Sequence, residues 1–91
     1  MSVQVRVPTV LRPRTGGAAV VDAEGGTIAE VIKSVDRSHP GFGDVIFEDS
    51  GQLKRFINVF LDDEDVRYLE GADTPVPDGA EVVILPAVAG G

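Results

Sequence analysis

The sequence predicts an α+β fold in which one main helix packs across one face of a mixed four- or five-stranded sheet. Three observations support this. The chain has 91 residues, 43% of them hydrophobic, which is enough for one small core. Segments near both ends alternate apolar and polar residues, as half-buried strands do. Only one segment repeats apolar residues at helical spacing. A single helix covers one face of a sheet, so the other face is expected to stay open.

Residues 3–7 form the first predicted strand, because valines alternate with polar side chains there. Pro8 stops this strand, and the Thr-Gly-Gly sequence at 15–17 is typical of a turn. Residues 18–21 are therefore expected to return as a hairpin partner.

The clearest element is a helix over residues 27–38. Thr27 and Glu30 have the spacing of a capping box, which satisfies backbone N–H groups at a helix start. Apolar residues then follow at i, i+3, i+4 and i+7 and predict one buried stripe: Ile28, Val31, Ile32 and Val35.

The remaining elements are less regular. Glycines and acidic residues in 41–55 favour a loop with a short extended or helical piece. After it we expect a strong strand at 56–61, an acidic turn at 62–65 and a short strand at 66–69. A surface loop at 71–79 and a last strand at 81–85 should follow. This element order is that of the ubiquitin-like β-grasp. We expect residues 1–86 to form that domain and 87–91 to be a flexible tail.

Composition and charge argue against several classes of protein. The chain has no cysteine and one histidine, which disfavours disulfides and thiolate or histidine-rich metal sites. Its net charge of −7 comes from residues 62–91, where Arg67 is the only base, and this charge disfavours nucleic acid. We expect no membrane partner and a cytoplasmic location, because no apolar run is long enough to span a bilayer and the N-terminus lacks a signal-peptide pattern.

Candidate catalytic and ligand motifs are weak. The acidic run 62–65 lacks the alternating ligand spacing of a calcium loop. His39 has no partner nucleophile and follows a helix, where its charge would favour the helix dipole. The Gly-Phe-Gly sequence at 41–43 lacks the third glycine of a phosphate loop. We therefore predict no intrinsic catalytic residue, no metal site and no bound cofactor.

The sheet face away from the helix is a candidate docking surface. Phe56, Asn58 and Phe60 alternate with aliphatic residues that should face the helix, and the last strand also places apolar residues on both faces. An equally weighted alternative is that residues 41–55 fold over this face. We predict Phe60 and Leu85 as the leading anchors, and the full docking set is Asn58, Phe60, Val83, Leu85 and Pro86.

The C-terminal residues 87–91 carry no charge and end in Gly90 and Gly91. Glycine has no Cβ, so such an end can thread a narrow channel and present its carboxylate to another protein. A frayed, inert tail has a similar composition. We expect the tail to be mobile, because Val88 is its only sizeable apolar side chain.

Three stretches together resemble the ubiquitin-like sulfur carriers of the ThiS/MoaD family: residues 7–17, 55–67 and 84–91. The third has the family's ending of an apolar strand, proline, valine and Gly-Gly. Within the family the chain looks most similar to the carriers of actinobacterial cysteine biosynthesis. Residues 36–54 depart most from the family pattern.

The resemblance implies a protein co-substrate rather than an enzyme. A ubiquitin-activating-type enzyme would use ATP to adenylate the Gly91 carboxylate, and sulfide or a persulfide would convert it to a thiocarboxylate. Val88, Ala89 and Gly90 would thread the enzyme's channel. The sulfur would then attack an aminoacrylate that a pyridoxal-phosphate cysteine synthase makes from O-phosphoserine, and a metalloprotease would release cysteine. The pyridoxal phosphate and the metal belong to those partners.

Other functions remain open. In one alternative, the sulfur goes to another product: molybdopterin, thiazole or a thiolated secondary metabolite. In two further alternatives, the chain is a protein modifier joined through Gly91 to lysines, or a β-grasp interaction module with an inert tail.

Overall fold

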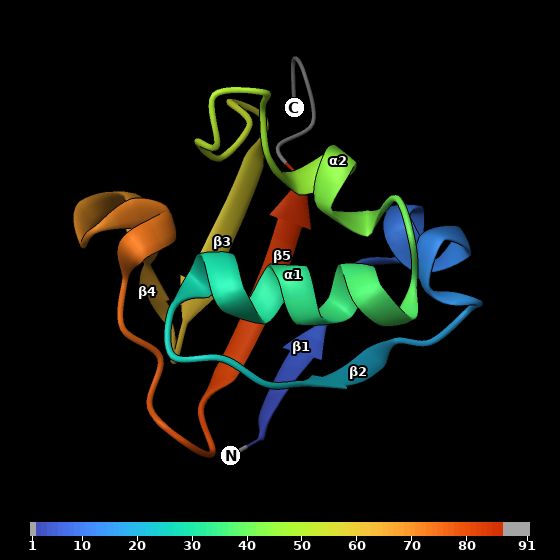
Figure 1. The fold of residues 1–91 in the computed structure, drawn as a ribbon, viewed down its shortest axis with the longest axis horizontal. Coiled ribbons are helices and arrows are strands. Elements are labelled where there is room, and N and C mark those ends of the chain that lie inside the picture. The colour runs from blue at the N-terminus through green and yellow to red at the C-terminus, as the bar shows by residue number, and fades with distance from the viewer. Residues whose placement is uncertain (1, 87–91) are drawn as a thin grey trace.

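The computed structural model describes residues 2–86, which form one sheet, two α-helices and three short 3₁₀-helices (Figure 1). The strands are β1 (Val3–Arg6), β2 (Val20–Ala23), β3 (Ile57–Leu61), β4 (Glu64–Asp65) and β5 (Glu81–Pro86). The α-helices are α1 (Ile28–Ser38) and α2 (Phe42–Ile46), and the 3₁₀-helices are Thr9–Thr15, Val66–Tyr68 and Gly71–Asp73. The predicted mixed sheet with one main helix across one face is confirmed.

The sheet has the order β2-β1-β5-β3-β4, so the last strand along the chain lies in the middle. β1 and β5 are parallel, and the other neighbouring pairs are antiparallel. Figure 1 shows α1 crossing in front of β5 and β1. The chain therefore leaves the sheet at Pro86 from a central strand that is held on both sides.

The core lies between the sheet and α1. The four predicted stripe residues of α1 have no exposed surface, and they pack with alternate residues of the strands: Val3, Val5, Ile57, Val59, Leu61, Val82 and Ile84. The Thr27 side chain accepts a hydrogen bond from the Glu30 backbone N–H at 3.2 Å, as the capping box predicts. The Glu30 carboxylate accepts from the Gly26 N–H at 2.8 Å, one residue earlier than in the usual reciprocal pair.

The predicted second strand was placed two residues too early. Residues 9–15 form a 3₁₀-helix rather than an irregular turn, and turn hydrogen bonds continue to the Ala18 N–H, which donates to Thr15. Pairing with β1 begins at Val20, opposite Arg6, and continues to Ala23. Asp22 fits within this strand because its side chain faces solvent.

The short helical piece expected within 41–55 is α2. Phe42 and Ile46 have no exposed surface, and α2 packs against α1, on the helix side of the sheet. This segment therefore does not fold over the opposite face, and that alternative is wrong for residues 41–55.

The strand predicted at 66–69 is also wrong. Asp62 and Asp63 both have positive φ, 46° and 75°, which makes a tight two-residue hairpin turn. The return strand β4 therefore starts at once, at Glu64, and Val66–Tyr68 is a 3₁₀-helix. Residues 71–79 are more than a surface loop, because Thr74 and Val76 are buried.

Candidate functional site

Four of the five predicted docking residues lie together on the face of the sheet away from α1. The prediction is wrong for Pro86, which pairs with the core residue Ile57 and therefore lies on the helix side of the sheet. Phe60 is opposite Val83, Asn58 is opposite Leu85, and Pro86 is the last residue paired with β3. On the outer face, Leu85 is 45% exposed, and Asn58, Phe60 and Val83 are partly buried. We call Asn58, Phe60, Val83 and Leu85 the docking face: a largely apolar surface that ends at Leu85, one residue before the last paired residue of β5.

Phe56 lies outside the paired part of β3 and is not part of the docking face. β3 begins one residue later than predicted, at Ile57, whose N–H donates to the Lys54 carbonyl at 3.0 Å in a turn. Phe56 lies in that turn and is 59% exposed. It adds exposed apolar surface near the start of β3, outside the paired strands.

Arg67 supports the docking face, a role that no local sequence pattern predicts. Its guanidinium donates to the Asn58 Oδ1 at 2.9 Å. It also donates to three backbone carbonyls, those of Lys54 at 2.6 Å, Arg55 at 3.0 Å and Ile57 at 2.7 Å. These bonds fix the start of β3, which pairs with Leu85 and Pro86. The available signal was that Arg67 is the only base in the acidic residues 62–91.

Two weak motifs have structural roles. In the acidic turn, the Asp62 carboxylate accepts from the Glu81 N–H at 3.0 Å, and the Asp65 carboxylate accepts from the Arg67 N–H at 2.9 Å. In the Gly-Phe-Gly segment, one Asp36 oxygen accepts from the N–H groups of both glycines, at 3.1 and 2.9 Å. Those N–H groups therefore already have a partner within the chain.

Within residues 2–86, no group of three or more side chains is arranged to hold a metal ion. No helix in that part of the chain is both long enough and apolar enough to cross a bilayer.

The predicted reactive end, Val88, Ala89, Gly90 and Gly91, and its predicted mobility lie outside the described residues. Five residues follow Pro86. At about 3.5 Å for each extended residue, they reach at most about 17 Å. An enzyme that acts at Gly91 must therefore place its active centre within that distance of Pro86, which directly follows Leu85 of the docking face.

A β-grasp domain with an open sheet face and a Gly-Gly ending defines the class of ubiquitin-like carriers and modifiers. The chain belongs to the ThiS family, whose model matches residues 5–91. It is 45% identical to the sulfur carrier protein CysO of Mycobacterium tuberculosis over 93 aligned positions, which cover all of both chains.

Two solved structures extend this comparison. CysO in the Amycolatopsis orientalis BexX/CysO complex superposes with a TM-score of 0.93 at 46% identity, over 98% of this chain and 99% of that one. Small archaeal modifier protein 1 from Methanosarcina acetivorans superposes with a TM-score of 0.84 at 30% identity, over 99% and 96% of the two chains. The predicted family is confirmed, and its carriers are small protein substrates of other enzymes rather than enzymes themselves.

Proposed function

We propose that the chain is a cytoplasmic sulfur carrier and that the carboxylate of Gly91 carries the sulfur. One observation supports this most strongly. The match to the ThiS family extends over residues 5–91, so it includes the Gly-Gly ending as well as the domain. The proposal requires Gly91 to be the C-terminal residue of the natural protein.

A carboxylate is a poor electrophile, so it must be activated before sulfide can attack it. Adenylation provides this activation because AMP is a good leaving group. A carboxylate oxygen of Gly91 attacks the α-phosphorus of ATP, and pyrophosphate leaves. Sulfide then attacks the carbonyl carbon of the acyl-adenylate, the bond to AMP breaks, and a thiocarboxylate remains. Both steps take place in the activating enzyme, which binds the ATP.

The folded domain determines where the Gly91 carboxylate lies in the activating enzyme. The docking face binds the activating enzyme, and the short segment 87–91 then limits where the carboxylate can go. Gly90 lets the chain pass through a tight channel because it has no side chain. Holding the reacting group close to the nucleotide in this way can account for a large part of a rate enhancement.

In this proposal the sulfur acceptor is the precursor of cysteine. The support is the likeness to CysO proteins over the full length of the chain. In this scheme a pyridoxal-phosphate synthase converts O-phosphoserine to an electrophile that the thiocarboxylate sulfur attacks, and a metalloprotease frees cysteine and restores Gly91. The relative found in complex with BexX supports assembly of the carrier with a partner protein. Molybdopterin, thiazole and thiolated secondary metabolites are the other possible products.

The test is intact-protein mass spectrometry after incubation with an activating enzyme from the same organism, ATP and sulfide. The mass of the natural protein first checks that Gly91 is the terminus. We expect a gain equal to the difference between one sulfur and one oxygen atom, mapped to Gly91. Gly90→Phe and deletion of Gly91 should abolish this gain without unfolding the domain. Ala87→Ser, a mild change in the same segment, should retain it.

Two outcomes would contradict the proposal. If Gly91 becomes joined to lysines of other proteins and never gains sulfur, the chain is a modifier, as the likeness to the archaeal modifier protein allows. If neither product forms with any activating enzyme of the organism, the tail is inert and the domain acts only by binding.

A further inference from the structure

A shallow hollow of about 190 Å³ adjoins the docking face on the side of β1. It lies between the outer side of β5 and the segments that follow β1 and precede β2. Its lining includes two arginines and several apolar side chains: Arg6, Pro8, Arg12, Ala19, Val83 and Leu85. Val83 and Leu85 belong to the docking face as well, so the two surfaces are continuous.

The two arginines differ in their pairing. The Arg6 Nε lies 2.6 Å from a Glu81 carboxylate oxygen, so its charge is balanced within the chain. The Arg12 Nε donates to the Val7 carbonyl at 3.2 Å, which fixes the side chain at the hollow. Among residues 2–86, no carboxylate oxygen lies within 4.0 Å of the Arg12 guanidinium. A strongly acidic chain thus presents a positively charged group beside its apolar docking face.

We propose that this hollow binds an acidic and apolar segment of the activating enzyme, with a carboxylate at Arg12 and an aliphatic or aromatic side chain against Val83 and Leu85. The inference rests on the proposed function. An ionised carboxylate gives a shorter and stronger hydrogen bond to arginine than a neutral acceptor does. Complementary charge also speeds the encounter of two proteins and fixes their register.

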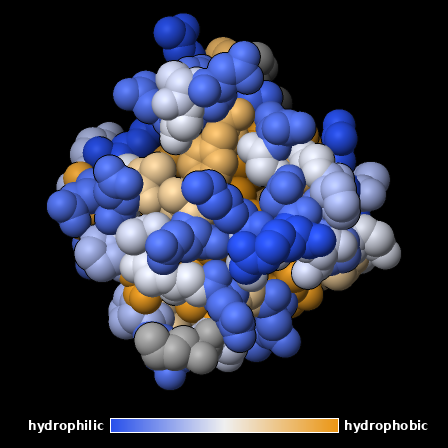
Figure 2. Space-filling view, viewed as in Figure 1, coloured by the Kyte–Doolittle hydropathy of each residue, from blue (hydrophilic) through white to orange (hydrophobic). Residues whose placement is uncertain are grey.

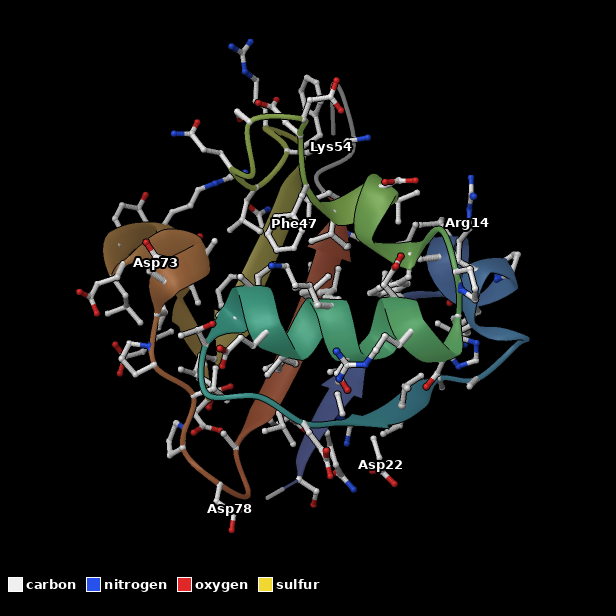
Figure 3. All side chains as sticks on the ribbon, in the orientation of Figure 1. Arg14, Asp22, Phe47, Lys54, Asp73 and Asp78 are labelled. Atoms are coloured by element: carbon white, nitrogen blue, oxygen red, sulfur yellow. The ribbon has the colours of Figure 1, made fainter. Side chains whose placement is uncertain are left out.

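The helix side of the molecule offers the opposite charge. Figure 2 shows an apolar hollow there, surrounded by hydrophilic side chains. Phe47, labelled in Figure 3, lines this hollow together with four acidic residues and one base: Asp36, Asp44, Glu48, Asp49 and Lys33. With four carboxylates against one ammonium group, this hollow would repel the acidic segment that we propose. Of the two hollows, only the one at Arg12 combines the required charge with contact to the docking face.

Arg12→Glu tests the proposal, and Arg14→Glu is the matched control. Arg14, labelled in Figure 3, lies on the same 3₁₀-helix and is exposed. It is not among the residues that line the hollow. The assay is pyrophosphate release by the activating enzyme of the same organism at varied carrier concentration. We expect Arg12→Glu to raise KM about tenfold, the effect of about 1.4 kcal/mol, with kcat unchanged. Arg14→Glu should change KM less than threefold, and Arg12→Lys should restore most of the affinity.

Ionic strength provides a second measurement. Raising the salt concentration should weaken binding of the unchanged carrier, and this dependence should be smaller for Arg12→Glu. Circular dichroism and chemical denaturation check that each variant is folded. Equal effects of Arg12→Glu and Arg14→Glu would overturn the proposal, because net charge alone would then explain them. An unchanged KM for folded Arg12→Glu would overturn it as well.

A different result would show that the proposed function itself is wrong. The activating enzyme would then release no pyrophosphate with the unchanged carrier, and calorimetric titration of the enzyme with carrier would replace the kinetic assay. Even then, a roughly tenfold weaker affinity of Arg12→Glu for the enzyme supports binding at the hollow. Equal affinities of the variant and the unchanged carrier, or no binding of either, overturn the proposal.

Discussion

The two faces of the same sheet differ sharply in how completely they are covered. Val5, Val59, Val82 and Ile84 have no exposed surface on the helix side. On the other side, Leu85 is 45% exposed, although it follows Ile84 directly in β5. Both faces are built from the same strands, and side chains simply alternate between them.

The comparison separates what folds the domain from what is available for recognition. The helix side loses its contact with water on folding, so its side chains contribute most of the hydrophobic stabilisation. The outer side keeps exposed apolar side chains that a partner can cover. Substitutions on the helix side should therefore change the free energy of unfolding, and substitutions on the outer side should mainly change binding.

Val31→Asp should have the largest effect on stability. Val31 is fully buried in α1, and a carboxylate there would have no partner in the apolar core. We expect the free energy of unfolding to fall by several kcal/mol, roughly 3 or more. Val20→Asp is the control, since Val20 is 39% exposed on the outer side of β2. Chemical denaturation measures both, and similar midpoints for the two variants would contradict the distinction between the faces.

Local patterns in the sequence predicted the helix-side face well. The capping box and apolar stripe located α1 within one residue, and alternation assigned Ile57, Val59 and Leu61 to the core. The errors have physical causes. α2 has only five residues, too few for a periodic signal, and the early start of β4 depends on two aspartates that adopt positive φ. Arg67 was missed because its four hydrogen bonds reach residues 9 to 13 positions away, which no local pattern records.

Phe60→Ala should have the largest effect on binding. Phe60 lies opposite Val83 in the docking face, and apolar anchors of this kind contribute about 2 kcal/mol at an interface. We expect KM for the activating enzyme to rise about 30-fold, the equivalent of about 2 kcal/mol. Phe56→Ala is the control, because it removes the same ring from the exposed turn before β3. A folded Phe60→Ala protein with the KM of the unchanged carrier would remove Phe60 from the docking face.

Arg67→Gln should have the smallest effect, and it tests how the outer face keeps its shape. The guanidinium joins Asn58 to the carbonyls of Lys54, Arg55 and Ile57, at the end of the sheet where Pro86 is paired. A typical hydrogen bond contributes about 1 kcal/mol net. Arg67 is exposed, so water can replace part of what is lost, and we expect the free energy of unfolding to fall by about 1 kcal/mol in total.

The variant should also raise KM about threefold without changing kcat, because the start of β3 would no longer be held beside Leu85. Arg37→Gln makes the same change on the exposed side of α1 and should alter neither quantity. Hydrogen exchange separates the two possible origins of the KM effect. If Arg67 acts locally, exchange accelerates at residues 54–58 and stays unchanged at α1. Uniform acceleration over the whole sheet would instead show that Arg67 stabilises both faces alike. Arg67 would then contribute to the stability of the domain rather than to the shape of the outer face alone.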